Sequence, residues 1–239
     1  MPLELRKSRT GRTLIESHRG VEADVPENSF PAVKMGYELG ADLIEVDVQL
    51  SSDGIPFLRH NYQLPDGRWC GQLAWKALKD IKIENEPLPL LEDILVWARD
   101  TGVILSLDLK SLFTPEYVLS KEVIRLLERM GTKDKTLLLF LDHHELYHVK
   151  QSHPDLAVRA LVTGRLAGYA DYIRKIGADC ISLSYGMFRP QDVDDIHSAG
   201  ASIVMGGLWN ANTDLFREME IDIFNHGNPS EAKKILPAI

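Results

Sequence analysis

Two carboxylates and a histidine flank a predicted β-hairpin near the N-terminus. Glu45 and Asp47 alternate with apolar residues, and this period of two is typical of a strand, so both carboxylates point to one face. Asp53-Gly54, which follows, is a strong signal for a two-residue hairpin turn. Such a turn predicts Asp47 opposite His60, with their Cβ atoms roughly 5 Å apart. A proton carrier would then lie beside a carboxylate pair, although a solvated hairpin with a polar outer face fits equally well.

Ionisable residues also follow two other apolar runs. Asp108 and Lys110 end the run at residues 103–107 and, being two positions apart, share a face on a strand. His18 and Arg19 follow the first apolar run of the chain. A surface Asp-Lys pair at a strand end is common and contributes little. Three strand ends that each supply ionisable residues nevertheless indicate a functional site.

The three carboxylates among these residues are suited to binding one cation. Glu45, Asp47 and Asp108 would form an all-oxygen site, and oxygen ligands are preferred by hard divalent ions. We therefore predict Mg²⁺ or Ca²⁺ rather than zinc, and the choice between the two stays open.

The remaining ionisable residues suit phosphoryl chemistry. His18 and His60 can act as acid and base near neutral pH. Arg19 and Lys110 can neutralise phosphate oxygens. Together with a cation, this set suits the cleavage of a phosphodiester, in which one imidazole removes a proton and the other protonates the leaving alkoxide.

Short apolar runs alternate with helix-like segments along the whole chain. Apart from a hairpin return at 55–59, we predict eight strands at residues 13–17, 43–48, 103–109, 137–141, 158–162, 180–183, 202–205 and 221–224. We predict helices at residues 31–39, 74–82, 91–100, 116–130, 145–151, 167–175, 190–199 and 212–218. This order predicts a (β/α)8 TIM barrel with a β-hairpin excursion after strand two, whose catalytic groups lie at the carboxyl ends of the strands. A doubly wound open sheet is the alternative.

Composition indicates an ordinary globular protein, which we expect to form a single domain over residues 1–239. The net charge of −8, without a basic block, argues against nucleic acid as a partner and favours a small-molecule substrate. Cys70 and Cys180 lack any CxxC pattern, which favours a reducing compartment. No leader and no apolar stretch of about 20 residues is seen, so we expect a cytoplasmic protein without stable membrane insertion. The oligomeric state stays open.

Taken in order, these motifs resemble the glycerophosphodiester phosphodiesterase family. The matching segments are His18-Arg19-Gly20, Pro26-Glu27-Asn28-Ser29, Gly40-Ala41-Asp42-Leu43-Ile44-Glu45-Val46-Asp47-Val48, Asp53-Gly54, His60, Pro89-Leu90-Leu91-Glu92-Asp93 and Asp108-Leu109-Lys110. An ordered set that spans about half of the chain is far more specific than one motif.

The resemblance implies a metal-dependent barrel enzyme with the same residues in its site. It implies that His18 and His60 are the acid-base pair, that the three carboxylates hold the cation, and that Arg19 and Lys110 contact the phosphate. The reaction course it implies is attack by a neighbouring substrate hydroxyl to give a cyclic phosphate, followed by hydrolysis. The products would be an alcohol and a phosphomonoester such as glycerol 3-phosphate.

Several residues depart from the family pattern. Asn61 replaces the usual aspartate after the second histidine, and Asp108 replaces the usual glutamate ligand. Sphingomyelinase D-type relatives share this Asp-Leu-Lys sequence and stop at the cyclic phosphate. Residues 61–87 are short for the family insertion and carry Trp69 and Trp75, which favours a different alcohol.

Other polar residues have simpler expected roles. We expect Asn28 to cap the following helix and Glu27 to bond to loop amides, with a direct role near the substrate as the alternative. His226 is expected to be a loop histidine, with contact to a sugar hydroxyl as the alternative. Three further histidines are expected on the surface at a helix start: His143, His144 and His148.

Three alternative functions stay open. The first is a cyclising phosphodiester lyase that acts on lysophospholipids or sugar phosphodiesters. The second is a catalytically silent barrel that binds a phosphorylated or sugar ligand, although such a site has no need of a paired acid and base. The third is an aldolase- or isomerase-type phosphate barrel, for which Gly206-Gly207 is only a weak signal.

Overall fold

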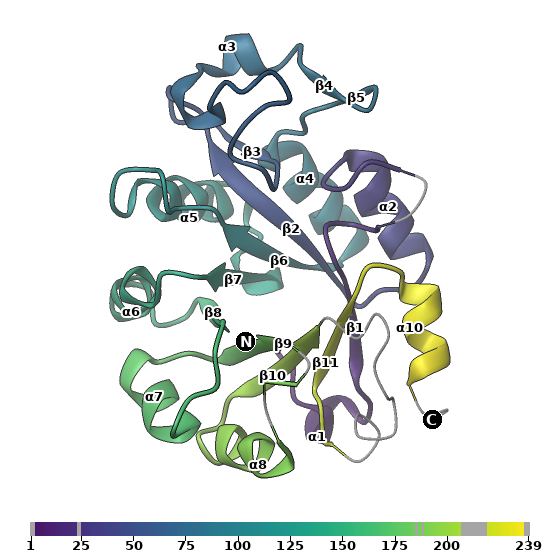
Figure 1. Ribbon diagram of the computed structural model, residues 1–239, viewed down its shortest axis with the longest axis vertical. Helices are drawn as coiled ribbons and strands as arrows, with labels where there is room; N and C mark the ends of the chain where they lie inside the picture. The colour runs from purple at the N-terminus through teal and green to yellow at the C-terminus, as the bar shows by residue number, and fades with distance from the viewer. Residues whose placement is uncertain (1–2, 23–24, 185, 188, 207–218, 237–239) are drawn as a thin grey trace.

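Eight parallel strands close into a barrel in the computed structural model, which describes residues 3–22, 25–184, 186–187, 189–206 and 219–236 (Figure 1). The strands are β1 (Leu14–Ser17), β2 (Leu43–Leu50), β6 (Ile104–Leu109), β7 (Thr136–Phe140), β8 (Ala157–Val162), β9 (Cys180–Ser184), β10 (Ser202–Gly206) and β11 (Ile223–His226). Because β1 pairs with both β11 and β2, the sheet has no open edge among these strands. The predicted TIM barrel is confirmed, and the open doubly wound sheet is excluded.

Helices surround the barrel (Figure 1). They are α1 (Lys7–Thr10), α2 (Phe30–Glu38), α4 (Leu91–Thr101), α5 (Val118–Met130), α6 (His143–Ser152), α7 (Tyr169–Ile176), α8 (Pro190–Ser198) and α10 (Pro229–Ile235). The helix α10 was not predicted, and the helix predicted at 212–218 lies outside the described residues. None of the helices in the described parts of the chain is long and apolar enough to cross a membrane.

The excursion between β2 and α4 forms a small cap at the edge of the barrel (Figure 1). It contains β3 (Pro56–Leu58), η1 (Cys70–Gln72), α3 (Trp75–Leu78), β4 (Lys82–Ile83) and β5 (Glu86–Pro87). The helix predicted at 74–82 is therefore wrong in extent, since only one turn forms before the chain enters the β4–β5 hairpin. The cap has its own apolar cluster, made of Phe57, Leu64, Cys70, Leu78 and Leu88.

The hairpin between β2 and β3 has a different register from the predicted one. Three residues, not two, form its loop, because Ser51 N donates to Ile55 O at 3.0 Å and Gly54 adopts a left-handed φ of 81°. Gln49 consequently pairs with Phe57, so the prediction that places His60 opposite Asp47 is wrong by one position. Arg59 takes that place, and its backbone N–H donates to Asp47 O at 3.0 Å.

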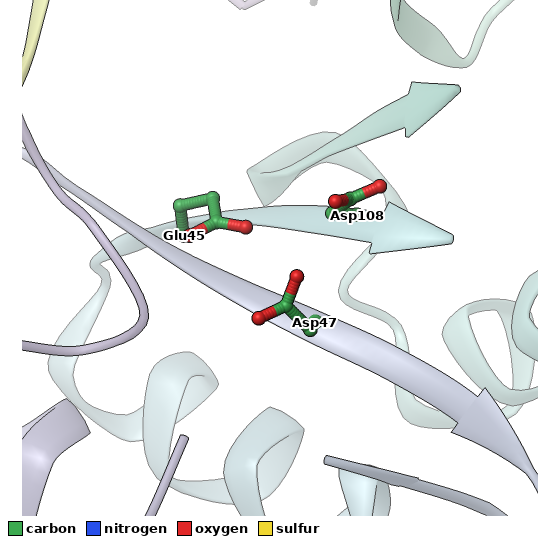
Figure 2. A group of neighbouring side chains, drawn as sticks. All are labelled: Glu45, Asp47 and Asp108. Carbon is green, nitrogen blue, oxygen red and sulfur yellow. The ribbon is translucent and has the colours of Figure 1, made fainter. Parts of the chain in front are cut away.

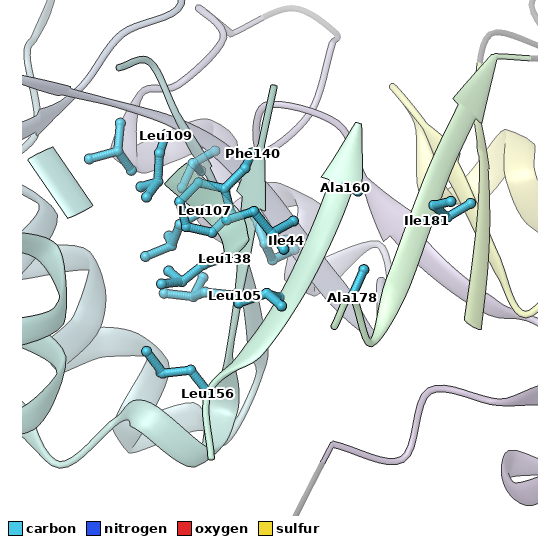
Figure 3. Close-up of a cluster of buried hydrophobic side chains, with 14 of the residues drawn as sticks. Ile44, Leu105, Leu107, Leu109, Leu138, Phe140, Leu156, Ala160, Ala178 and Ile181 are labelled. Carbon is cyan, nitrogen blue, oxygen red and sulfur yellow. The ribbon is translucent and has the colours of Figure 1, made fainter. Parts of the chain in front are cut away.

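The main hydrophobic core lies between the strands and the surrounding helices. Apolar residues on the outer faces of β6, β7 and β9 pack against helices there, as Figure 3 shows for Leu105, Leu107, Leu138 and Ile181. The amino-terminal end of the barrel interior is filled by a second apolar layer. It comprises Leu5, Leu14, Leu43, Leu137, Cys180, Val204 and Ile223.

The barrel interior becomes charged toward the carboxyl ends of the strands. Glu16 is two residues beyond Leu14 on β1 and is fully buried. Arg159 on β8 donates two hydrogen bonds to it, at 2.7 and 2.8 Å. One further layer along, β2 and β6 carry the acidic residues of the candidate site.

Candidate active site at the carboxyl end of the barrel

Three carboxylates meet at the carboxyl ends of β2 and β6. Asp47 and Asp108 are direct partners in the parallel register, and Glu45 is two residues earlier on the same face of β2. One carboxylate oxygen from each residue lies within 4.8 Å of those from the other two, and all three residues are buried (Figure 2). Among the described residues this is the only group of three or more side chains with metal-ligand spacing. The predicted juxtaposition is confirmed.

Lys110 supplies positive charge to this cluster. Its Nζ lies 2.7 Å from Asp47 Oδ1 and also pairs with Asp108. Although burial lowers the pKa of Lys110, the two carboxylates raise it above the ordinary value. The ammonium group shows that a cation is favoured at these oxygens. The partners of Lys110 in this structure are these carboxylates, and its predicted contact with phosphate stays a prediction.

The three carboxyl groups differ in their tendency to ionise. Burial and the nearby Asp47 raise the pKa of Glu45 to about 8, while His18 acts in the opposite direction. Burial also raises the pKa of Asp108, against the effect of Lys110. Asp47 is buried too, but Lys110, His60 and Arg19 outweigh burial and lower its pKa. Three buried acids therefore do not all ionise readily unless more positive charge arrives.

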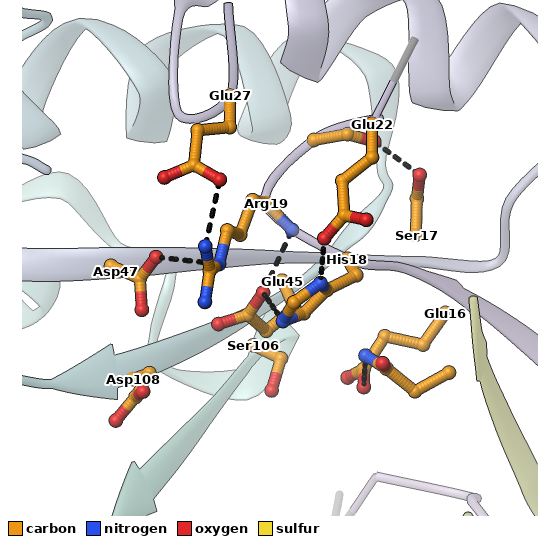
Figure 4. A network of polar contacts seen from close by, with 12 residues as sticks. Glu16, Ser17, His18, Arg19, Glu22, Glu27, Glu45, Asp47, Ser106 and Asp108 are labelled. Atoms are coloured by element: carbon orange, nitrogen blue, oxygen red, sulfur yellow. Dashed lines mark hydrogen bonds and ion pairs between the residues drawn. The ribbon is translucent and has the colours of Figure 1, made fainter. Parts of the chain in front are cut away.

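Glu22 is a partner of His18 that sequence reasoning missed. His18 Nδ1 pairs with Glu22 Oε1, and His18 Nε2 lies 4.0 Å from Glu45 Oε2 (Figure 4). Burial lowers the pKa of His18, but Glu22 and Glu45 raise it more, so the net shift is upward. A carboxylate on one ring nitrogen orients the imidazole and favours its protonated form. Glu22 follows His18 by four residues, and this spacing was the signal in the sequence that could have indicated their contact.

The loop between β1 and α2 is held in place by close backbone packing. Gly20 has a φ of 83°, and a Cβ there would lie 2.7 Å from the backbone of Ala32 in α2. Its N–H donates to Glu45 O at 2.9 Å, and the N–H of Arg19 donates to Glu45 Oε2 at 2.8 Å. A glycine after His18 and Arg19 is therefore required for this loop to reach the carboxylates.

Arg19 reaches toward the same carboxylates from this loop. Its guanidinium donates to Glu27 Oε2 at 2.7 Å, and its Nε lies 3.4 Å from Asp47 Oδ2 (Figure 4). Glu27 was expected to bond to loop amides, but this contact joins it to the side chain of Arg19. Arg19 thus lies beside the site, where its positive charge offsets the negative charge of the acidic cluster.

Asn28 forms hydrogen bonds with Asp47 and does not cap a helix. Its side chain donates to Asp47 Oδ2 at 2.7 Å and accepts from the Asp47 N–H at 2.8 Å. The expectation that Asn28 caps the helix is wrong, because Ser29 is the N-cap of α2 and accepts from Ala32 N–H. A left-handed φ of 57°, which asparagine tolerates, turns the amide toward β2. Asn28 and Ser29 are both residue types that cap helices, and the actual cap lies one residue later than predicted.

His60 lies beyond the end of β3, in a turn fixed by a buried amide. Gln49 Nε2 donates to the carbonyl oxygens of Arg59 and Asn61, both at 2.8 Å. His60 Nδ1 faces Asn61 Oδ1 at 3.1 Å. His60 is one of the groups that lower the pKa of Asp47, although it is not the register partner of that residue.

Two hollows are lined by residues that contact the carboxylates, Asn28 in one and Lys110 in the other. One of about 240 Å³ is lined by residues that include Asn28, His60 and Glu86. The other, of about 320 Å³, lies beside Lys110 and has aromatic walls. There the ring centroids of Tyr62 and Phe113 are 4.6 Å apart, and those of Trp69 and Phe113 are 5.1 Å apart; Phe113 is 63% exposed. We name this second hollow the aromatic groove.

A buried polar network beneath the carboxylates was also missed. Besides its bonds to Glu16, Arg159 donates to Ser106 Oγ at 3.2 Å and to Ser182 Oγ at 2.8 Å. Asn225 completes the network by donating to Glu16 Oε2 at 2.7 Å. These five residues come from five strands, so only the closed barrel brings them together. No local sequence pattern could have indicated this.

His226 lies at the carboxyl end of β11 and is largely buried. It is the register partner of Ser17, and its Nδ1 accepts from the Asn228 N–H at 2.9 Å. Burial lowers its pKa. The residue is therefore a strand-end histidine at the same rim as the site, and not a loop histidine as expected.

The carboxylates fit a hard divalent cation. Three acidic residues from two adjacent strands present oxygen atoms within 4.8 Å of each other, and oxygen is the ligand type that Mg²⁺ and Ca²⁺ prefer. The buried negative charge is offset only in part by Lys110 and Arg19. The residues present thus match the requirements of such an ion, while its identity is not fixed by them.

Comparison with protein families gives a match across most of the chain. Residues 18–227 match the model of the glycerophosphoryl diester phosphodiesterase family. The uncharacterised protein YqiK of Bacillus subtilis is 30% identical over 179 residues, which are 70% of this chain and 73% of that protein. A glycerophosphodiester phosphodiesterase of Caldanaerobacter subterraneus is 28% identical over 163 residues, 63% of this chain and 67% of that enzyme.

Solved structures share the fold at low sequence identity. A phosphodiesterase of Oleispira antarctica, in complex with the product sn-glycerol-3-phosphate, superposes with a TM-score of 0.85 at 20% identity and covers 95% of this chain and 97% of that one. A putative glycerophosphodiester phosphodiesterase of Galdieria sulphuraria gives a TM-score of 0.83 at 19% identity, over 93% and 97% of the two chains. At these identities the likeness establishes the barrel fold.

Proposed function

This chain belongs to the glycerophosphoryl diester phosphodiesterase family and is a phosphoric diester hydrolase of that family; we propose that it cleaves a small glycerol or sugar phosphodiester with a divalent cation and two histidines. The products are an alcohol and a phosphomonoester such as glycerol 3-phosphate. The observation that carries the proposal is the buried cluster of Glu45, Asp47 and Asp108 at the carboxyl end of the barrel.

Glu45, Asp47 and Asp108 are the proposed ligands of one Mg²⁺ or Ca²⁺ ion. When bound, the ion supplies positive charge that stabilises the negative charge developing on the phosphate oxygens. Asn28 orients Asp47 through two hydrogen bonds. With a cation at the carboxylates, Lys110 and Arg19 would be available to contact the phosphate.

His18 and His60 are the proposed acid-base pair. Since Glu22 and Glu45 raise the pKa of His18, the protonated imidazole is favoured, and His18 suits protonation of the leaving alkoxide. His60, beside Asp47, would then remove the proton from the attacking substrate hydroxyl. In the hydrolysis of the resulting cyclic phosphate, the two histidines exchange these roles.

The two hollows beside the carboxylates suit the two substituents of a diester. The hollow at His60 is lined by both polar and apolar residues, and the aromatic groove has ring faces on which the apolar face of a glycerol or sugar can pack. We propose that the phosphate lies between them. Both cysteines of the chain are buried and unpaired, which suits a reducing compartment, and we propose the cytoplasm as the location.

The test is turnover of glycerophosphocholine and a panel of sugar phosphodiesters with Mg²⁺, Ca²⁺ or a chelator, followed by phosphorus NMR. We expect release of a phosphomonoester that requires both the cation and His18, so that His18→Ala is inactive. No turnover of any diester would overturn the proposal.

A cyclising lyase is the second candidate, because Asp108 replaces the glutamate usual at this ligand position. Aspartate has a shorter reach than glutamate, and the relatives that share it stop at a cyclic phosphate. The same NMR experiment separates the two candidates. A cyclic phosphate that persists as the end product would support the lyase, and its conversion to the monoester would support the hydrolase.

A further inference from the structure

Two histidines on α6 face each other across one helical turn, well away from the proposed catalytic residues in sequence. His144 and His148 are four residues apart, and their Nε2 atoms lie 3.3 Å apart. Both residues are exposed, and the His144 side chain retains 66% of its accessible surface. Because α6 runs for ten residues, the two imidazoles are presented by regular helix and not by a loop.

This spacing matches the one that a shared metal ion imposes. An ion bound tetrahedrally by two imidazoles at about 2.0–2.1 Å separates the two nitrogen atoms by roughly 3.3–3.4 Å. Residues i and i+4 of a helix are a known arrangement for such a pair, and the sequence here reads His144-Glu145-Leu146-Tyr147-His148.

The second nitrogen of His144 has partners that would orient a ligating imidazole. The Tyr117 hydroxyl lies 2.8 Å from His144 Nδ1, and Glu116 Oε1 lies 3.7 Å from the same atom. Metal-bound histidines usually direct their other nitrogen to a carboxylate or another oxygen acceptor. When Nε2 binds an ion, the proton moves to Nδ1, where these two oxygens can accept it.

With Glu145 after the first histidine, the segment matches the His-Glu-x-x-His motif of metalloproteases, but Glu145 does not complete a catalytic centre. Its side chain is only 2% exposed, whereas both imidazoles are open to solvent. In a metalloprotease the corresponding glutamate activates water at the ion. A buried glutamate beside an exposed histidine pair does not fit that role, so the geometry favours ion binding without peptide hydrolysis.

We propose that His144 and His148 form a surface site for one borderline transition-metal ion, of which Zn²⁺ and Cu²⁺ are examples, separate from the carboxylate site. Imidazole ligands select such ions over Mg²⁺ and Ca²⁺. The protein supplies two ligands and water completes the coordination. The bound ion would link α6 to the start of α5 through Tyr117, which precedes α5 directly.

The proposal is tested by Zn²⁺ titration calorimetry and Cu²⁺ electron paramagnetic resonance, with excess Mg²⁺ present. We expect the intact chain to bind one more Zn²⁺ ion than His148→Gln or His144→Gln, and affinity at this site to fall on the order of 100-fold when the second ligand is removed. Nitrogen coupling from two imidazoles should appear with Cu²⁺ and be reduced to one in either variant.

His153→Gln is the matched control, because His153 directly follows the same helix but is not part of the pair. It should bind both ions like the unmodified chain. Tyr117→Phe should weaken Zn²⁺ binding about tenfold while both nitrogen couplings persist. Identical binding isotherms for the unmodified chain and both glutamine variants would overturn the proposal. These measurements use no substrate, so their outcome is independent of the phosphodiesterase proposal.

Discussion

The carboxylate site and the histidine pair on α6 are two places that suit a cation, and they differ in burial and charge. The carboxylates are almost fully buried and carry up to three negative charges. The imidazoles are exposed and neutral in the form that binds metal. Removing charged groups from water is costly, so the buried acids need compensating positive charge, whereas the exposed pair does not.

This difference explains how the surroundings of the two sites are built. Around the carboxylates, Lys110 and Arg19 offset charge, Asn28 fixes Asp47, and the pKa of Glu45 still rises to about 8. Around the imidazoles, Tyr117 and Glu116 lie at Nδ1 of His144, and the rings of Tyr117 and Tyr147 contact His148. A buried acidic cluster thus favours a bound cation, which in turn can attract an anionic substrate, while an exposed histidine pair provides a site that the fold does not depend on.

The proposed acid-base histidines should give the largest effect. We expect His18→Ala and His60→Ala each to lower kcat by about 10²–10⁴, because each removes a positioned proton carrier. Mg²⁺ affinity should change little, since neither imidazole is a proposed ligand. Steady-state kinetics and calorimetry would check both statements, with His153→Ala as the control. Turnover of either variant within a few-fold of the unmodified chain would contradict the assignment.

Stability should respond to loss of buried charge far more than to loss of an exposed imidazole. Arg159→Met leaves Glu16 buried without its cationic partner, and we expect a loss of about 3–5 kcal/mol in the free energy of unfolding. For His148→Gln, at the exposed pair, the change should stay within about 0.5 kcal/mol. Urea unfolding measures both. Similar losses in the two variants would contradict the proposed difference between buried charged groups and exposed imidazoles.

Glu22 should act on turnover through His18. Glu22→Gln removes the group that raises the pKa of His18, so that pKa should fall and the alkaline limb of the pH–rate profile should move to lower pH. We expect kcat at neutral pH to fall by about 10–100-fold, the usual effect of losing an orienting carboxylate on histidine. An unchanged profile would show that Glu22 does not position the imidazole, whereas partial recovery in Glu22→Asp would support it.

The raised pKa of Glu45 predicts how the stability of the chelated protein depends on pH. The folded state holds a proton on Glu45 between its ordinary pKa of 4.5 and about 8, whereas the unfolded state releases it, so stability should fall as pH rises through this window. Each unit of pKa shift corresponds to about 1.4 kcal/mol, or roughly 3–6 °C in Tm for a chain of this size. Thermal scans with chelator should show this decline, and Mg²⁺ should reduce it; a flat profile would contradict the shift.

The sequence predicted the barrel and the carboxylates because both depend on local periodicity. Alternation places Glu45 and Asp47 on one face, and parallel pairing then brings Asp108 beside Asp47 without further information. Apolar runs separated by helical segments were enough to predict eight strands, although their limits shift by one or two residues.

Features that depend on turn geometry or distant pairing were not predictable in the same way. Whether the loop at Asp53-Gly54 has two or three residues changes the register by one, and the bond between Ser51 and Ile55 selects three. Arg159 meets Glu16 across 143 positions of sequence, so only barrel closure brings them together. The pair on α6 was correctly predicted to be exposed, but its i, i+4 spacing was not recognised as a ligand pattern.

The central claim is that the buried carboxylates hold the cation that phosphodiester cleavage requires. The most direct test is to titrate Mg²⁺ or Ca²⁺ into the chelated protein while turnover and calorimetric binding are followed in parallel, for the unmodified chain and for Asp108→Asn. We predict that activity and binding reach half-saturation at the same cation concentration and that Asp108→Asn loses both. Full turnover in the presence of chelator, or an active Asp108→Asn that no longer binds the ion, would contradict the claim.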